Sequence, residues 1–173
     1  MSLPFALIAL LAVTPTPKAA ISSPSANPPG PPQFLPLEAE WCLPTTASPS
    51  PGCIRLEVPR TPRQFSWGLM QRPPLEPLRG MWFRFDPPQK VSFWMHRTPA
   101  PLDMVFVRGE RVVAIEAAAP CPRLPCRSYG PEAAVDGVVE LGAGQAAALG
   151  ITPGGPAPIR WLAPLKPPVP AAR

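Results

Sequence analysis

The sequence contains one histidine and few charged residues. His96 is the only histidine, charged residues make up 16% of the 173 positions, and no Gly-x-Ser-x-Gly segment occurs. One histidine and one Cys-x4-Cys pair do not supply the ligands of a tetrahedral zinc site, and His96 lacks the context of a catalytic triad. A glycine-rich phosphate loop is also missing, so neither nucleotide binding nor triad hydrolysis is indicated.

Basic residues outnumber acidic ones but are scattered singly. The chain has 16 Lys and Arg against 11 Asp and Glu, which gives a net charge of +5. Without a basic run or stripe, the sequence lacks the electrostatic footprint of a nucleic-acid-binding protein, and we expect no nucleic-acid partner. No segment approaches the length of a transmembrane helix, so we do not expect an integral membrane protein once a leader is removed.

Proline is abundant but unevenly distributed. The 32 prolines and 12 glycines make up about a quarter of the chain. Because proline ends helices, this composition excludes a mostly helical protein, and the lack of a Gly-X-Y period excludes collagen. No proline falls within 102–119 or 132–152, which indicates a folded domain between proline-rich ends.

The two ends differ in composition from the middle of the chain. Residues 5–13 are nine consecutive apolar residues, the length of a signal-peptide core. We predict a signal peptide over 1–26, a proline-rich linker over 27–36, one compact domain over 37–163 and a loose proline-rich tail over 164–173. The leader predicts export to a periplasm, a thylakoid lumen or the extracellular space.

Four cysteines allow three disulfide pairings. We favour Cys42 with Cys53 and Cys121 with Cys126, because each pair brackets a proline-rich loop that nothing else holds. Disulfides require an oxidising compartment, which agrees with the leader. The spacing of Cys121 and Cys126 does not match the Cys-x-x-Cys pattern of redox enzymes, so a structural disulfide is favoured there.

Apolar patterning predicts a mainly β (α+β) domain, small and barrel-like or sandwich-like, with about seven short strands arranged mostly as meanders. One short helix is expected to begin with Thr61 as its cap, Pro62 as its first residue and Gln64 completing a capping box, and to end near Arg72. A second helix is expected over 143–149. The predicted strands cover 54–58, 80–85, 91–97, 102–107, 111–116, 138–141 and 158–162, with a turn at 86–88.

Several segments come in a distinctive order. They lie at 67–72, 80–85, 93–106, 138–144 and 149–151, and the most specific part is Phe-Trp-Met followed by Pro-Leu-Asp within 93–106. Together these segments resemble domain-of-unknown-function family 192, also called uncharacterised protein family 0127, over about 54–162.

The resemblance implies a small, mostly β domain with short helices that is often exported. It implies no activity, because the family has none established. The loop from Cys121 to Cys126 looks like the form in exported, cyanobacterium-type members. Arg97 stands where the family usually has Asn, so any role of the asparagine side-chain amide in the family is in question for this chain.

Asp103 is the most suggestive charged residue. It lies in an apolar strand, and a carboxylate that shares the inward face of Val105 and Val107 would need partners to offset its burial. Thr98, Arg97 and the backbone N–H groups near 99–101 are the expected partners. Asp103 is interpreted either as the acid of a pocket or as a structural residue that holds the proline-rich turn.

Trp82 and Trp94 are candidate walls of a cleft, where their rings would stack on a sugar or another flat ligand. The alternative is that a helix covers the face of the sheet that carries them. His96 and four methionines are candidate ligands of copper(I), but core filling by methionine is favoured. The methionines are Met70, Met81, Met95 and Met104.

The favoured hypothesis is an exported, monomeric binding module without a cofactor, rather than an enzyme. Its cleft would lie near the turn from Thr98 to Asp103, with Trp94, Trp82 and Arg97 beside it, and would bind a small molecule such as a carbohydrate, or a protein. One alternative is a carbohydrate-active enzyme that uses Asp103 as acid or base, with Glu116 or Glu140 as the second carboxylate. The other is a copper or redox accessory protein.

Overall fold

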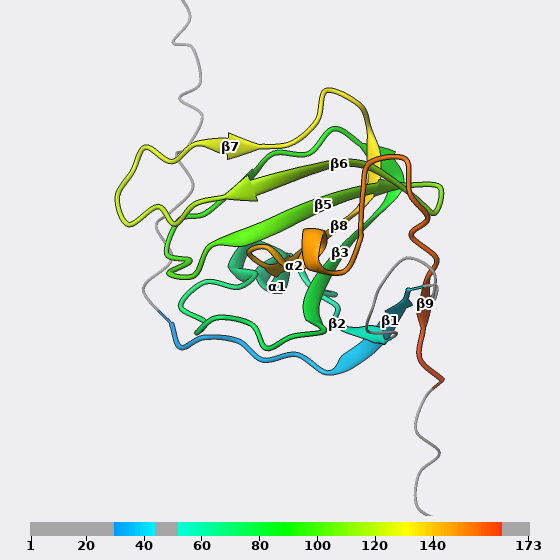
Figure 1. Ribbon diagram of the computed structural model, residues 1–173. Helices are drawn as coiled ribbons and strands as arrows, with labels where there is room; N and C mark the ends of the chain where they lie inside the picture. Colours follow the sequence, from blue (N-terminus) through cyan, green and yellow to red (C-terminus); the bar gives the residue numbers. More distant parts are fainter. Residues whose placement is uncertain (1–29, 44–51, 164–173) are drawn as a thin grey trace, which may run out of the picture. The chain divides into compact units, whose positions relative to one another are not determined.

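The computed structural model describes residues 30–43 and 52–163, which form nine strands and two short helices (Figure 1). The prediction of a mainly β domain with two short helices is therefore confirmed. The strands are β1 (Leu37–Cys42), β2 (Cys53–Glu57), β3 (Arg79–Gln89), β4 (Phe93–Trp94), β5 (Leu102–Arg108), β6 (Arg111–Ala118), β7 (Ser128–Tyr129), β8 (Val135–Gly142) and β9 (Ile159–Trp161). The helices are α1 (Pro62–Trp67) and α2 (Gln145–Ala148). Within the two described ranges, neither helix has the length and hydrophobicity that a membrane crossing requires.

Seven of the strands form one sheet in the order β6-β5-β8-β3-β2-β1-β9, and β4 pairs with β7 in a second sheet. The pair β2 and β3 is parallel, whereas the other neighbouring pairs are antiparallel. The larger sheet is not closed into a barrel. The predicted meander is wrong at its centre, because β8 inserts between β3 and β5 and keeps these two strands apart.

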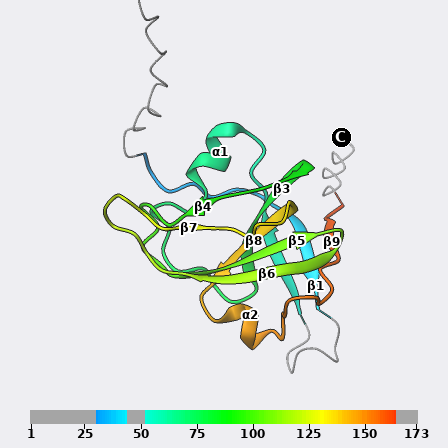
Figure 2. The same ribbon diagram turned by 90° about the horizontal axis from the view of Figure 1, so that it is seen from above.

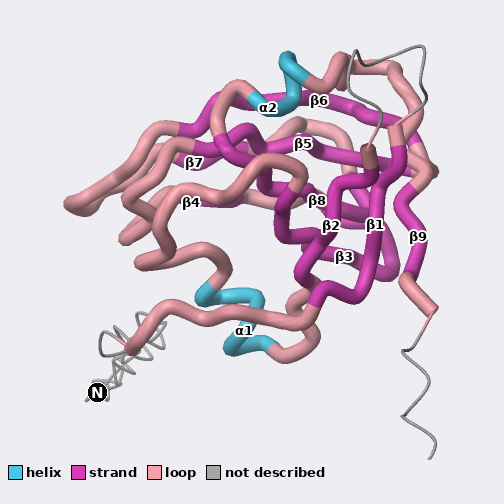
Figure 3. The backbone as a smooth tube through the Cα atoms, turned by 60° about the horizontal axis from the view of Figure 1, so that its bottom comes forward, coloured by secondary structure: helices cyan, strands magenta, loops and turns pink. Residues whose placement is uncertain are grey.

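The larger sheet buries side chains on both faces. Along β5 the side chains alternate between two core clusters, with Met104 and Phe106 in one and Val105 and Val107 in the other. Figure 2 shows α1 and α2 on opposite sides of this sheet, and Figure 3 shows the same arrangement from another direction. Coverage on both sides explains why β5 reads as a continuous apolar run interrupted by Asp103.

Two strand predictions differ from the structure. The strand expected over 91–97 is reduced to β4, because the chain turns at Arg97, where φ is 57° and the N–H of Thr98 donates to the carbonyl of Met95 (3.1 Å). The turn expected at 86–88 lies within β3, which continues to Gln89. Residues 85–88 nevertheless leave the ladder with β8, since two of them are prolines and have no N–H to donate.

The start of α1 was predicted correctly. The Thr61 hydroxyl accepts the backbone N–H of Gln64 (3.2 Å), and the Gln64 side chain accepts the backbone N–H of Thr61 (3.0 Å). The helix ends at Trp67 rather than near Arg72, because Gly68 adopts a positive φ of 48° and stops it. The strand β1 was not predicted.

The compact unit that holds these elements begins at Pro31. Residues 33–35 were expected in the linker, yet the Gln33 side chain donates to the carbonyls of Gln64 and Gly68, both at 2.9 Å. The backbone N–H of Leu35 also donates to the Glu57 carboxylate (2.8 Å). This part of the predicted linker is therefore bound to the domain, whereas the predicted signal peptide and tail lie outside the described residues.

Both favoured disulfides are present. One joins Cys42, the last residue of β1, to Cys53, the first residue of β2, and the other joins Cys121 to Cys126. The two bridges close loops with sequence separations of 11 and 5 residues.

Removing either disulfide should destabilise the domain, because the loop that the disulfide closes becomes freer in the unfolded chain. We expect the double variant C42S/C53S to lose about 3 kcal/mol of unfolding free energy and C121S/C126S about 2 kcal/mol, because the longer loop gains more freedom in the unfolded chain. Urea unfolding of both variants and the wild type measures this difference. A larger loss for C121S/C126S would contradict the loop-entropy explanation.

Candidate functional site

The face of the larger sheet that carries α1 contains a pocket of about 400 Å³. Its walls come from α1 and the turn after it, from β3, and from β4 with the loop before it. Six aromatic residues line it, namely Phe65, Trp67, Phe83, Phe85, Phe93 and Trp94. The pocket therefore offers an aromatic wall built largely on regular structure, next to the polar side chains of Ser66, Gln89, Ser92 and Thr98.

The phenylalanines hold one another in place. Phe83 contacts Phe65 at a ring-centroid distance of 5.8 Å and Phe93 at 5.0 Å, both edge to face, and Phe85 contacts Phe93 at 6.4 Å. Such pairs are favourable beyond the area they bury, so this wall is formed before any ligand arrives. Trp94 is 48% exposed, which leaves much of its ring free to meet a ligand.

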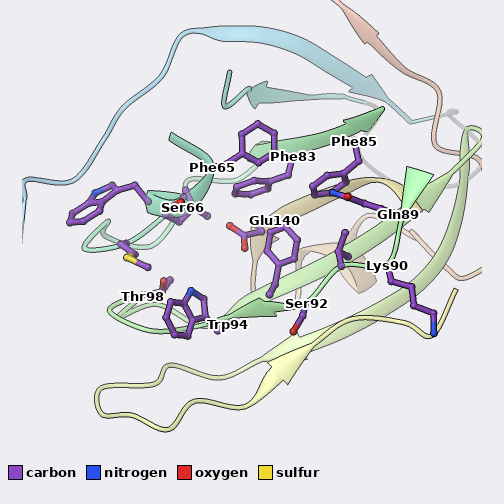
Figure 4. A pocket seen from close by; sticks show the side chains of 16 residues that line it. Phe65, Ser66, Phe83, Phe85, Gln89, Lys90, Ser92, Trp94, Thr98 and Glu140 are labelled. Carbon is purple, nitrogen blue, oxygen red and sulfur yellow. The ribbon is translucent and has the colours of Figure 1, made fainter. Parts of the chain in front are cut away.

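Glu140 lies at the bottom of the pocket. It is on β8, opposite Met81 of β3 and Met104 of β5, and both methionines are completely buried. Figure 4 shows the Glu140 carboxylate pointing into the pocket, with Phe65, Phe83 and Phe85 on one side and Thr98 and Trp94 on the other.

The Glu140 carboxyl group is buried without a partner. Only 5% of the residue is exposed, and its carboxylate makes no hydrogen bond or ion pair with any residue that the structure describes. Burial raises the pKa of Glu140 from 4.5 to about 8, because the charged form loses its hydration. A carboxyl group that faces a cavity under these conditions is a strong candidate for a functional residue.

One other titratable side chain lines the pocket. Lys90 lies in the loop before β4, and its Nζ is 3.0 Å from a carboxylate oxygen of Glu132. Both side chains of this pair are largely exposed, so the lysine charge is at the mouth and is already paired. Among the described residues that line the pocket, the acidic side chain thus lies at the bottom and the basic side chain at the mouth.

The five residues proposed from the sequence do not meet at one site. Trp94 and Thr98 line the pocket with Glu140. Trp82 belongs to the core cluster on the opposite face of the sheet, where its ring is 5.3 Å from that of Trp161. Arg97 takes part in the turn after β4, and its carbonyl accepts the N–H of Gln71 (2.7 Å). The two tryptophans expected to form the walls of one cleft therefore lie on opposite faces of the sheet.

Asp103 is buried on the face shared with Val105 and Val107, which is the condition from which both interpretations of this residue start. Its partner differs from those expected, because its carboxylate accepts the backbone N–H of Ala146 in α2 (2.9 Å). The hydrogen bond attaches α2 to β5. Asp103 does not line the pocket, so the geometry agrees with the structural interpretation of this residue.

Neither alternative function is supported by the arrangement. Asp103 and Glu140 lie on opposite faces of the sheet, and Glu116 accepts the backbone N–H of Gly130 (2.9 Å). Glu116 shares its cross-strand neighbour Met104 with Glu140, but neither Glu116 nor Asp103 lines the pocket that Glu140 faces. Three of the four methionines weighed for copper are core residues, in agreement with core filling. They are Met81, Met95 and Met104.

Sequence reasoning named Glu140 only as one of two candidates for a second carboxylate beside Asp103, and it missed Phe65 and Phe85. A usable signal was present, since Glu140 is the one charged residue in the apolar segment 138–141. The phenylalanines carried no such signal, because they come from α1 and β3 and meet only in the folded chain.

Comparison with known proteins places this fold in a family. The family model DUF192, described as "Uncharacterized ACR, COG1430", matches residues 45–158. The chain belongs to this family. The resemblance noted in the sequence is thus confirmed, while the exported, cyanobacterium-type detail stays a prediction. None of the curated proteins compared with the chain matches it.

Two solved structures resemble this DUF192 domain. A protein of unknown function from Novosphingobium aromaticivorans is 32% identical with a TM-score of 0.59, and the match covers 72% of this chain and 84% of that one. A protein from Sinorhizobium meliloti, proposed to be a transcription regulator, is 28% identical with a TM-score of 0.61, and the match covers 72% of this chain and 92% of that one.

Proposed function

We propose that this DUF192 domain is a binding module for a small organic molecule, held in the pocket between α1, β3 and β4. The observation that supports it best is the Glu140 carboxyl group, which is buried, has no partner among residues 30–43 and 52–163 and faces the pocket. The volume of about 400 Å³ lies within the range of small-molecule sites.

A bound molecule would satisfy the polar group that the protein leaves unsatisfied. A buried carboxyl group without hydrogen bonds costs folding free energy, and buried polar groups of native proteins are almost always hydrogen-bonded. A ligand that supplies a polar partner to Glu140 and lies against the aromatic wall would offset this cost. Trp94 and Thr98, two residues proposed from the sequence, would contact it at the edge.

We also propose that the domain acts as a monomer outside the cytoplasm. Two disulfides support this location, because they are more common in exported proteins. Recovery of the chain from an oxidising compartment without residues 1–26 tests the export, and its native mass tests the monomer.

The binding site can be tested with 2-phenylethanol, a neutral probe that fits an aromatic pocket. We expect Trp94→Ala to weaken binding of this probe about fivefold, because one exposed ring contact is lost. Trp161→Ala is the matched control, since Trp161 is 43% exposed and lies outside this pocket. Isothermal titration of the two variants and the wild type measures the dissociation constants.

Equal affinities of the three proteins would show that the probe binds elsewhere. Native mass spectrometry of the freshly purified protein gives a second readout, because a retained ligand adds its mass to that of the chain. Absence of both probe binding and retained mass would overturn the proposed function.

A further inference from the structure

We infer that the ligand of this pocket carries a primary ammonium group on an apolar or aromatic body, with the ammonium bound at Glu140. The inference rests on the proposed function and names the class of molecule that the same site selects. It follows from the hydrogen-bond capacity of Glu140, the aromatic wall and the position of the neighbouring charges.

An ionised carboxylate can only accept hydrogen bonds, and an ammonium group can only donate them. The Glu140 carboxylate faces the cavity and receives no donor from the described residues. An ammonium ion offers three N–H donors and a positive charge, and a charge-assisted pair of this kind is stronger than a neutral hydrogen bond. A quaternary ammonium would leave the carboxylate oxygens without donors, so a group with N–H bonds fits better.

The aromatic wall favours the same charge. The faces of phenylalanine and tryptophan rings attract cations that approach within about 6 Å of their centroids. Phe83, Phe93 and Trp94 line the cavity that the Glu140 carboxylate enters. An ammonium at Glu140 would therefore lie in a cavity that these rings line, while the apolar body of the ligand would lie against the remaining phenylalanines.

An anionic ligand would find no compensating charge at the bottom of the pocket. The turn after α1 contributes Leu69 and Met70, β3 and β4 contribute aromatic residues and Gln89, and the cross-strand neighbours of Glu140 are Met81 and Met104. Lys90, the one cationic side chain in the lining, is at the exposed mouth and paired with Glu132. A carboxylate or phosphate ligand would thus be repelled once Glu140 is ionised, and would find no cation beside it among the residues that line the bottom of the pocket.

The inference makes binding dependent on pH. Because the pKa of Glu140 is raised to about 8, the group must release a proton before it can pair with a cation at neutral pH. An alkyl ammonium resembles the lysine side chain, with a pKa near 10.4, and keeps its own proton up to about pH 9. Affinity for the ammonium should therefore rise with pH through the region in which Glu140 ionises.

The test compares 2-phenylethylamine with 2-phenylethanol, which carries a hydroxyl group in place of the ammonium group. In the wild type, the amine should bind at least about tenfold more tightly at about pH 8.5 than at about pH 6, whereas the alcohol should change little. Glu140→Gln should lose at least about tenfold of the amine affinity at about pH 8.5 and keep its affinity for the alcohol. Glu76→Gln, which removes an exposed carboxylate outside the pocket, is the control of equal charge and should behave as the wild type.

The outcomes separate this inference from the proposed function. If both probes bind with equal affinity, and Glu140→Gln changes neither, the ammonium inference is overturned and the small-molecule pocket stands. An affinity for the amine that falls with rising pH would also overturn it, because a protonated Glu140 would then be the binding form. If neither probe binds and no ligand is retained, both proposals fail. The pH dependence of the wild type decides the question even if Glu140→Gln does not fold.

Discussion

The unfolding free energy of this domain should fall as the pH rises from about 4.5 to about 8, and Glu140→Gln should remove most of that fall. Burial raises the pKa of Glu140 in the folded protein, whereas the unfolded chain ionises this group near 4.5. Between the two values the folded state holds a proton that the unfolded state has released. Each pH unit in this interval therefore costs about 1.4 kcal/mol, and the whole effect is on the order of 5 kcal/mol.

The stability contributed by Glu140 is fully present below about pH 4.5 and is lost once the pH passes about 8. Urea unfolding at intervals between about pH 5 and about pH 8.5 measures this dependence, with the disulfides kept intact. Other ionisable groups titrate equally in the wild type and the variant, so the difference between the two curves isolates Glu140. Glu76→Gln controls for the removal of one exposed carboxylate. Parallel curves for the wild type and Glu140→Gln would contradict the prediction.

Sequence patterns that act between neighbouring residues predicted the local structure of this chain well. The cap of α1 follows from Thr61, Pro62 and Gln64, because each acts on backbone groups within one helical turn. The hairpin of β5 and β6 follows from the turn predicted at 108–110, where Gly109 and Glu110 both have positive φ. Both disulfides join cysteines that are close in the sequence, and their pairing could be predicted from the sequence for that reason.

Pairing between distant strands could not be predicted in the same way. No local pattern shows that β8 enters between β3 and β5, since the partners of Glu140 lie 36 or more residues away in the sequence. The same limit explains why the sequence pointed to Asp103 rather than to Glu140 as the candidate pocket acid. Asp103 and Glu140 both interrupt apolar strands, but Ala146, which satisfies Asp103, comes from a helix 43 residues later. Which carboxylate keeps a partner is decided by the fold.

Arg72→Met should lower the unfolding free energy by about 3–5 kcal/mol, because it leaves Glu57 buried without its cation. One Arg72 nitrogen lies 2.9 Å and 3.0 Å from the two carboxylate oxygens of Glu57, and each residue is 8% exposed. The same nitrogen donates to the carbonyl of Gln33 (3.1 Å), and the guanidinium lies 4.2 Å from the ring centroid of Phe34. The pair thus holds residues 33–35 against the domain as well as the turn after α1.

The matched control is Arg84→Met, which removes an arginine from an exposed ion pair. Arg84 and Asp86 are 3.4 Å apart with side chains 49% and 77% exposed, and such pairs contribute less than about 1 kcal/mol. Urea unfolding compares the two variants, and limited proteolysis reports on residues 33–35. We expect proteases to cut this segment faster in Arg72→Met than in Arg84→Met. We also expect Arg72→Met to lose several times more unfolding free energy, because one buried guanidinium makes both contacts. Similar losses in the two variants would contradict the prediction, because they would show that loss of the cation leaves no costly buried charge at Glu57.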